Sequence, residues 1–74
     1  MKLLWETAMY AKATDRQYAD IDRVRYYVKR AERERRYDSE PFALTVNGSH
    51  RGYFATMDAA KSHAQTLEDF RQTV

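Results

Sequence analysis

A short arginine-rich run is the part of the chain with the clearest chemical meaning. Between Arg23 and Arg36, seven of the fourteen residues are Lys or Arg and two are Glu, so the run carries a charge of +5. The residues before it sum to −1 and those after it to −2. Nearly all of the positive charge is therefore concentrated in one segment, and we expect an anionic partner to bind there.

Arginines and tyrosines in and beside this run make up most of the candidate binding residues. Arginine outnumbers lysine nine to four over the chain, and a guanidinium can hold a phosphate or a carboxylate through two parallel hydrogen bonds. Tyrosine adds a ring that can stack on a base or anchor a protein interface. The residues predicted to contact a partner are Arg23, Tyr26, Arg30, Arg33, Arg35, Arg36 and Tyr37, together with Trp5 and Arg51 outside the run.

A plainer interpretation of the run is also open. Glu32 and Glu34 could pair with neighbouring arginines along a helix, which would make the segment an ordinary solvated surface.

The motifs of catalysis and of metal binding are missing from the sequence. The chain has no cysteine, and His50 and His63 do not have the spacing of a zinc site. The two glycines, Gly48 and Gly52, are both used by a predicted hairpin, so no phosphate-binding loop remains, and no serine stands in a nucleophile motif. We therefore expect a protein that is not an enzyme and that uses no metal or cofactor.

Length and composition predict one domain spanning residues 1–74. A chain of this size buries only about 60% of its unfolded surface, which argues against a deep catalytic cavity. The chain is 43% hydrophobic and 32% charged, as is typical of a folded domain. No signal peptide is visible, and no segment approaches the roughly 20 apolar residues of a membrane span. The sequence predicts a monomer in the cytoplasm of a bacterial host, with no membrane partner.

The elements that would position the basic run begin with a long helix. Residues 14–17 have the form of a capping box, in which Thr14 and Gln17 satisfy each other's backbone donors. Acidic residues gather near this start and arginines near Arg36, as the helix dipole favours. The predicted helix runs to about Arg36, and its core-facing stripe consists of Ile21, Val24, Val28 and Ala31.

Residues 1–13 have more than one interpretation. Alternate residues could line one face of a strand, but helical order and a flexible arm that becomes fixed on a partner are also open. The residues of the proposed strand face are Leu3, Trp5, Thr7, Met9 and Ala11.

A hairpin follows Pro41, which cannot continue a helix. Residues 42–46 and 49–55 are predicted to be its strands, because an Asn-Gly pair between alternating apolar residues is a strong hairpin signal. A plain two-residue turn would put the second aromatic residue on the wrong face. A bulge at Arg51-Gly52 shifts the phase by one residue and places Phe54 opposite Phe42.

A C-terminal helix completes the predicted fold. Thr56 is the expected N-cap, and the helix should cover the hairpin with an apolar face. That face consists of Met57, Ala60, Ala64, Leu67 and Phe70. The predicted class is therefore α+β: a long basic helix, an antiparallel hairpin with a third strand if residues 1–13 pair, and a C-terminal helix.

Two resemblances follow from these features. The stretch FALTVNGSHRGYFATMDAA, residues 42–60, resembles the hairpin and helix of the arm-binding domains of phage integrases, in which a small sheet packed on one helix reads DNA. Those domains have three strands and a basic sheet face, whereas this hairpin carries only His50 and Arg51. In size, lack of cysteine and lack of catalytic motifs, the chain also resembles small phage-encoded inhibitors of bacterial RNA polymerase or of CRISPR effectors, which implies stoichiometric binding.

Three functional hypotheses follow. The first is a non-catalytic protein of a phage or mobile element that docks its basic helix on a host nucleic-acid-processing machine, with RNA polymerase as the expected target, and regulates transcription. The second is direct binding of DNA or RNA, in which the arginines of residues 30–36 contact phosphates while His50 and Arg51 approach from the hairpin. The third is self-association through the apolar N-terminal segment.

Overall fold

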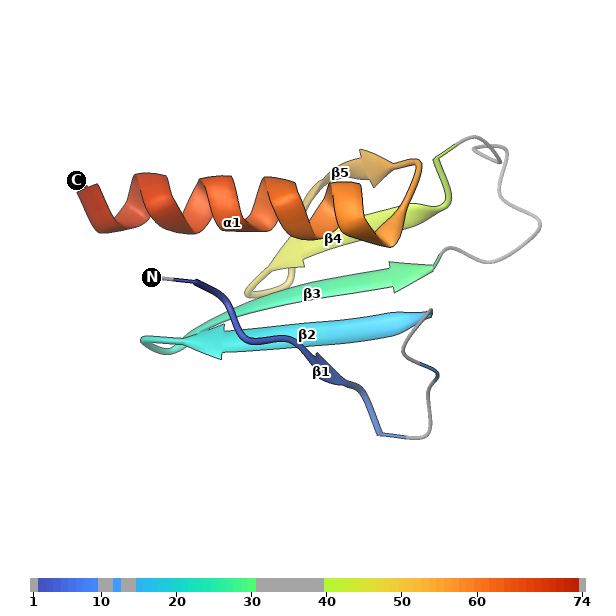
Figure 1. Cartoon of the computed structure of the whole chain (residues 1–74), viewed down its shortest axis with the longest axis horizontal. Coiled ribbons are helices and arrows are strands. Elements are labelled where there is room, and N and C mark those ends of the chain that lie inside the picture. Colours follow the sequence, from blue (N-terminus) through green and yellow to red (C-terminus); the bar gives the residue numbers. More distant parts are fainter. Residues whose placement is uncertain (1, 10–11, 13–14, 31–39, 74) are drawn as a thin grey trace.

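Two β-hairpins and a short edge strand form one antiparallel sheet with a helix on one side (Figure 1). The computed structural model describes residues 2–9, 12, 15–30 and 40–73. Each strand pairs with the next one in the chain, so the sheet is a meander. The elements are β1 (Glu6–Thr7), β2 (Arg16–Ile21), β3 (Val24–Arg30), β4 (Phe42–Val46), β5 (Ser49–Phe54) and α1 (Met57–Thr73).

The prediction of a long helix over residues 14–36 is wrong for its described part. Residues 16–30 are the hairpin β2–β3, closed by Asp22 and Arg23, which both have positive φ, 51° and 67°. Tyr26 decides between the two periods: with Val24 and Val28 it makes a period-2 apolar face, and aromatic and β-branched residues favour strands. Burial of this face outweighs a capping box, which contributes only about 1 kcal/mol.

The apolar stripe predicted for that helix nevertheless lies in the core. Val28 is fully buried, and Ile21 and Val24 pack at the edge of the core cluster. Val24 and Val28 are four residues apart and fit both a helical and a strand period, and the turn brings Ile21 opposite Val24. The core residues could therefore be predicted while the element was not. Thr14 and residues 31–36 of the predicted helix lie outside the described residues.

The hairpin β4–β5 confirms the predicted register. Phe42 pairs with Phe54, and the pairing shifts so that Arg51 is the extra residue on the bulged strand. Gly52 takes a φ of 141° there, a conformation that other residues rarely adopt. The hairpin does not stand alone, however, because β4 also pairs with β3 and thereby joins a sheet of five strands.

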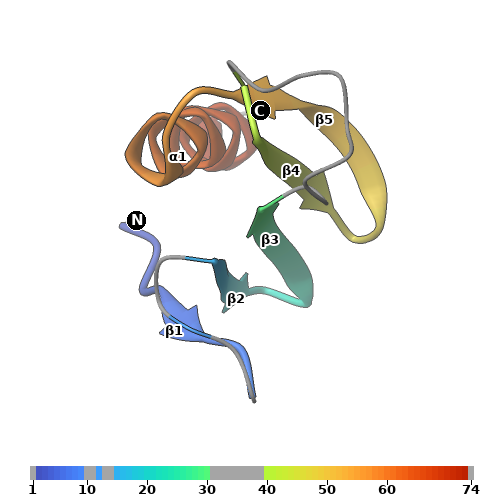
Figure 2. The same cartoon turned by 90° about the vertical axis from the view of Figure 1, so that its right-hand side faces the viewer.

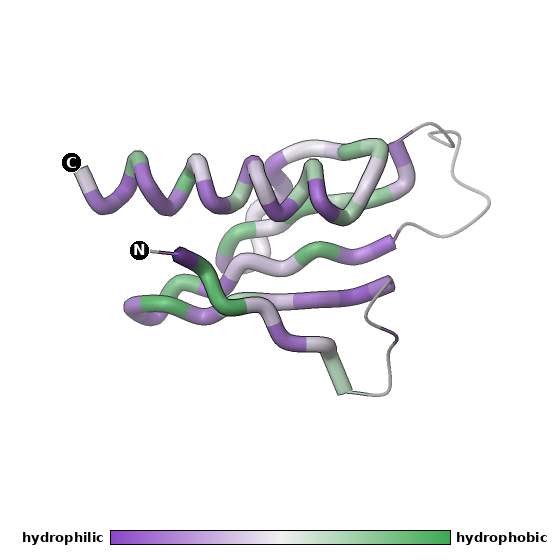
Figure 3. The backbone as a smooth tube through the Cα atoms, in the orientation of Figure 1, coloured by the Kyte–Doolittle hydropathy of each residue, from purple (hydrophilic) through white to green (hydrophobic). Residues whose placement is uncertain are grey.

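Helix α1 begins as predicted and lies on the concave side of the curled sheet (Figure 2). The hydroxyl of Thr56 accepts a hydrogen bond from the backbone N–H of Ala59 at 3.0 Å, which caps the helix. Ala60 and Ala64 are fully buried, and these small side chains let the helix approach the strands closely. Hydrophobic residues recur along the helix between hydrophilic ones (Figure 3).

Phe70 was predicted to belong to the buried face of α1, and the structure contradicts this. Its side chain is 68% exposed, and Glu68 occupies the buried row instead, four residues after Ala64. The last turns of the helix are therefore held to the sheet by a polar network rather than by an aromatic ring.

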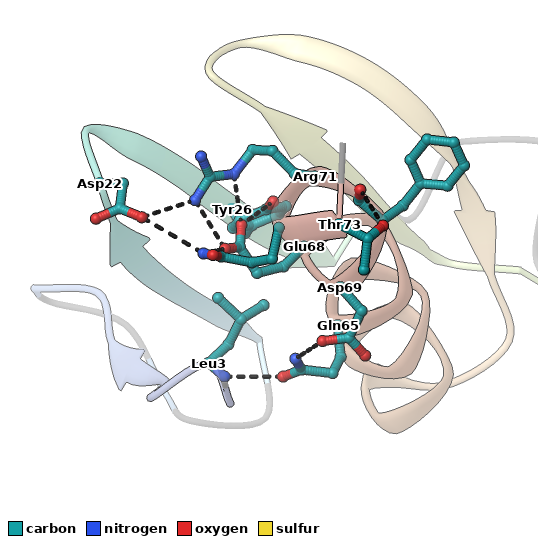
Figure 4. A network of polar contacts seen from close by, with 10 residues as sticks. Leu3, Asp22, Tyr26, Gln65, Glu68, Asp69, Arg71 and Thr73 are labelled. Atoms are coloured by element: carbon teal, nitrogen blue, oxygen red, sulfur yellow. Dashed lines mark hydrogen bonds and ion pairs between the residues drawn. The ribbon is translucent and has the colours of Figure 1, made fainter.

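That network centres on the carboxylate of Glu68, which is fully buried (Figure 4). The hydroxyl of Tyr26 donates to it at 2.7 Å, and Arg71 donates from Nε at 2.9 Å and from Nη2 at 2.7 Å. Gln72 adds a fourth donor at 2.5 Å. Arg71 also reaches Asp22 at 3.0 Å, so the helix is tied both to β3 and to the β2–β3 turn.

Charge and burial shift the acidities within this network. The hydrogen bonds from Arg71 lower the pKa of Glu68 to about 2, against the opposing effect of burial. Burial, together with the hydrogen bond to Glu68, raises the pKa of Tyr26 to about 12. The Glu68 and Asp22 carboxylates raise the pKa of Arg71. The carboxylate is therefore ionised and the phenol protonated at neutral pH.

The N-terminal segment contributes less strand than was predicted. Leu3 is buried, and its backbone N–H donates to Gln65 of α1 at 2.8 Å. Of the described residues in this segment, Glu6 and Thr7 alone form a strand with β2, and Met9 is 80% exposed although it was expected on the core face. No helix in the described residues is long and apolar enough to cross a membrane.

The Glu68 network should make the fold sensitive to acid. Because the folded-state pKa is about 2 and the ordinary value is 4.5, its stabilisation is complete above about pH 5 and is lost as the pH falls toward 2. Glu68→Gln should lower the free energy of unfolding at pH 7 by about 2 kcal/mol, since neutral amide bonds replace charge-assisted ones. Urea unfolding should show that the free energy of unfolding falls less between pH 7 and pH 3 in the variant than in the parent. An equal fall in both proteins would mean that this carboxylate does not set the acid response.

Gly52→Ala should lower the free energy of unfolding by about 1 to 2 kcal/mol, because the bulge requires a positive φ. A Cβ at this position would lie 3.7 Å from the ring of Phe54, an ordinary contact, so the cost comes from the backbone. Gly48→Asn is the matched control, since its φ of 86° lies near the region that asparagine tolerates and nothing lies within 4 Å. Equal midpoints of urea unfolding for the two variants would contradict this account.

Candidate functional site

The face of the sheet turned away from α1 carries the candidate site. Side chains alternate along a strand, so Tyr26 and Val28 point to the helix while their neighbours on β3 point to the other side. Among the described elements, α1 packs on β3, β4 and β5, and no described residue of the opposite side is fully buried. We call this side the outer face; it consists of Glu6, Arg16, Tyr18, Asp20, Arg25, Tyr27, Lys29, Ala43, Thr45, His50 and Tyr53.

A row of side chains crosses the middle of the outer face. Tyr18 pairs with Tyr27, Tyr27 with Thr45, and Thr45 with His50, so the row runs over β2, β3, β4 and β5. Neighbouring strands lie about 4.8 Å apart, and the row therefore spans about 14 Å. The small side chain of Thr45 separates the tyrosine pair from the histidine. Planar rings thus stand at both ends of a shallow row.

Tyr53 extends the aromatic surface on β5. Its ring lies 4.6 Å from that of His50, centroid to centroid, and tilted by 53°. Tyr53 is 38% exposed, so part of the ring faces solvent. The outer face therefore carries three tyrosines and a histidine within four neighbouring strands.

Two cations border this row on one side. Arg16 and Lys29 stand directly opposite each other on β2 and β3, and both are exposed. Neither side chain has a hydrogen bond or an ion pair to another described residue. Like charges at directly opposite positions destabilise a sheet, so this pair has a cost in folding and raises the local positive potential.

An ion pair borders the row on the other side. Arg25 donates to the carboxylate of Asp20 from Nε at 2.7 Å and from Nη2 at 2.8 Å. These hydrogen bonds lower the pKa of Asp20 and raise that of Arg25. The guanidinium also lies 4.7 Å from the centroid of the Tyr18 ring, a cation–π contact. Arg25 is therefore already partnered, whereas the side chains of Arg16 and Lys29 have no partner in the part of the chain that the structure describes.

The structure disperses the residues that the sequence predicted as the binding set. Tyr26 is 1% exposed and bonded to Glu68, so its ring is not part of the surface. Arg30 ends β3, with its guanidinium 5.6 Å from the Phe42 ring. Trp5 is partly buried against the core, 5.6 Å from the ammonium of Lys61.

The remaining predicted residues lie in turns or outside the described part of the chain. Arg23 stands in the β2–β3 turn and Arg51 at the bulge of β5. The placement of four others is not described: Arg33, Arg35, Arg36 and Tyr37. The described members therefore do not form the single stripe that a helix would have made.

The outer face was missed because its period was misjudged. Residues 16–20 read Arg-x-Tyr-x-Asp and residues 25–29 read Arg-x-Tyr-x-Lys, so both strands carry a basic residue, a tyrosine and a second charge at alternate positions. As strands, these segments put all six side chains on one face; as a helix, they scatter them.

Comparisons of the chain with protein-family models, with curated proteins and with solved structures found no match. In the described part of the chain, no three His, Asp or Glu side chains lie together as a metal site would require.

The charge of the outer face can be tested without any assumed partner. Asp20→Asn should raise the salt concentration that elutes the protein from heparin, because the face now has three cations against two carboxylates and would lose one of the latter. Lys29→Gln should lower it. Both residues are exposed, so the midpoint of urea unfolding should hardly change in either variant. If both variants eluted at the same salt concentration as the parent, the outer face would not dominate the electrostatic potential of the protein.

Proposed function

We propose that the protein is a non-catalytic nucleic-acid-binding protein that holds a single-stranded segment of RNA or DNA on the outer face. The observation that carries this proposal is the row of Tyr18, Tyr27 and His50 across the side of the sheet turned away from α1, bordered by Arg16 and Lys29, whose side chains have no partner among the described residues. Rings beside cationic side chains match the two parts of a nucleotide, the base and the phosphate.

The rings provide the stacking part of the site. Tyr18 and Tyr27 are half-buried, so each is held by its neighbours and still exposes part of its surface. The contact from Arg25 restrains the Tyr18 ring further. A base stacked on such a ring contributes about 1 to 3 kcal/mol and does so for every base, which predicts tolerance of sequence.

The cations provide the phosphate part. Arg16 and Lys29 lie next to the tyrosine pair on the same face, two residues along each strand from the row, so a backbone following this border could place its bases over the rings. With only these two cations the electrostatic contribution is modest. We therefore expect affinities in the micromolar range at low salt rather than tight binding.

The same features favour unpaired bases over a duplex. In a duplex the faces of the bases are hidden in the stack, and rings on a sheet can reach only edges and backbone. The likeness of residues 42–60 to arm-binding domains, in which a sheet reads DNA, keeps duplex DNA as the alternative that the experiment must separate.

Docking on a host machine such as RNA polymerase stays a prediction. It was assigned to a long basic helix, and residues 16–30 of that segment are strands, so the outer face takes its place as the binding element. An origin in a phage or mobile element, a cytoplasmic location, a monomeric state and the lack of an enzymatic activity stay predictions as well.

Binding should be measured by fluorescence anisotropy with labelled single-stranded RNA and DNA of about ten nucleotides and with the matching duplex. Tyr27→Ala should weaken binding of the single strands by about fivefold to a hundredfold, because one stacked base is lost. Replacing Arg16 and Lys29 together by Gln should reduce the slope of log affinity against log salt by about 1.4, since each phosphate contact contributes about 0.7.

Matched variants separate binding from folding. Tyr27→Phe keeps the ring and should bind like the parent, and Phe70→Ser alters the opposite side of the sheet and should have no effect on nucleic acid. The proposal fails if no single strand binds at low salt, or if Tyr27→Ala binds as well as Tyr27→Phe. Tighter binding of the duplex than of either strand would favour the arm-binding alternative.

A further inference from the structure

A second surface lies on the helix side of the sheet and is independent of the outer face. A groove of about 340 Å³ runs between the last turns of α1 and the ends of the two hairpins. Its apolar walls are Val24 and Val46 from the strands and Leu67 and Phe70 from the helix, and Arg51 and Arg71 also line it. The groove is open to solvent rather than enclosed.

Phe70 gives this groove a large exposed apolar side chain. Its ring is 68% exposed although it lines an apolar groove, whereas Leu67 beside it packs partly against the core. The Phe70 ring from the helix and the two valines from the strands line the groove together and offer an apolar surface. An apolar side chain seated there would be covered from the helix and from the strands.

The arginines around the groove differ in whether their side chains have an ion-pair partner. Arg71 is occupied by Glu68 and Asp22. The side chain of Arg51 has no hydrogen bond or ion pair to a described residue, and the bulge sets it out of the regular alternation of β5. The side chain of Arg23, next to Val24 in the β2–β3 turn, likewise has none within the described part of the chain. The groove is thus lined by one arginine that two carboxylates hold and by a second, Arg51, that no described carboxylate holds.

We propose that this groove binds a short peptide segment of a protein partner in which large apolar side chains stand next to an aspartate or glutamate. The apolar side chains would lie against Phe70 and Leu67, and the carboxylate would accept two hydrogen bonds from Arg51, with Arg23 adding to its attraction. Charge complementarity is what selects an acidic segment over a neutral or basic one.

The shape of the groove favours a peptide over a small molecule. A pocket for a small ligand encloses most of the ligand's surface, and an open groove of this size does not. A peptide compensates by extending along the groove and beyond it, with only its anchor side chains seated. The protein would then hold nucleic acid on one face of the sheet and a protein segment on the other.

The test is a selection of random displayed peptides of about a dozen residues on the intact protein, with the double variant Arg51→Gln and Phe70→Ser for counter-selection. Enriched sequences should combine Leu, Phe, Ile or Trp with Asp or Glu. A synthetic peptide from this set should bind more weakly by about tenfold to Arg51→Gln. In amide NMR spectra, the parent should shift at Val24, Val46 and Leu67 when the peptide is added.

Arg23→Gly separates binding from folding. A glycine relieves the positive φ of 67° in the turn, so the midpoint of urea unfolding should stay level or rise. Peptide affinity should nevertheless fall by about threefold, because the positive charge next to Val24 is lost. The outer-face variant Tyr27→Ala should bind the peptide like the parent, so a failure of the proposed nucleic-acid site would leave this result unaffected.

Several outcomes would overturn the proposal. These are enriched peptides without acidic residues, peptides that bind the double variant equally well, and a selection from which no peptide binds below about 1 mM. A dimer in sedimentation that Phe70→Ser dissociates would make a second copy of the chain the occupant instead.

Discussion

The buried carboxylate of Glu68 is the interaction on which the arrangement of this protein depends. It takes the place that an apolar side chain would hold in the last turns of α1, and four donors satisfy it, including Tyr26 of β3 and Arg71 of the helix itself. An ionised group at zero exposure is tolerated only with such partners, because desolvation alone would cost several kcal/mol. The network therefore fixes the position of the helix along β3, which Ala60 and Ala64 alone would leave free to slide. Both proposed surfaces depend on this: β3 gives Tyr26 to the network and Tyr27 to the outer face, and the groove exists only where the helix is held over the hairpin ends.

Much of the C-terminal half could be predicted from the sequence, because its signals are local and agree with one another. The Asn-Gly turn, the bulge at Gly52 and the Thr56 cap each require a particular residue at a particular position, and the structure contains all three. The hairpin β2–β3 has the same kind of turn, with two positive φ values, but builds it from Asp22 and Arg23. Without asparagine or glycine the turn left no recognisable signal, so the capping box and the distribution of charge favoured a helix.

The candidate site could not be predicted for a related reason. Charge and aromatic content indicated an anionic partner. Which side chains share a surface, however, depends on whether the segment is a helix or a strand, and a helix was predicted where the structure has strands. Tyr26 and Tyr27 illustrate this, since the first is in the core and the second on the outer face. The polar network could not be predicted from the sequence either. It joins residues 42 positions apart, and the sequence around Glu68 is typical of an exposed helix residue.

The meander has a consequence for how the chain reaches its structure. Each strand pairs only with its neighbour in the sequence, and two of the connections are two-residue turns, so most of the sheet closes short loops with a small loss of chain entropy. The bonds from Tyr26 to Glu68 and from Leu3 to Gln65 instead span 42 and 62 positions. We therefore expect the strands to pair early by local steps, and the helix, whose docking joins distant segments of the chain, to pack on the sheet last.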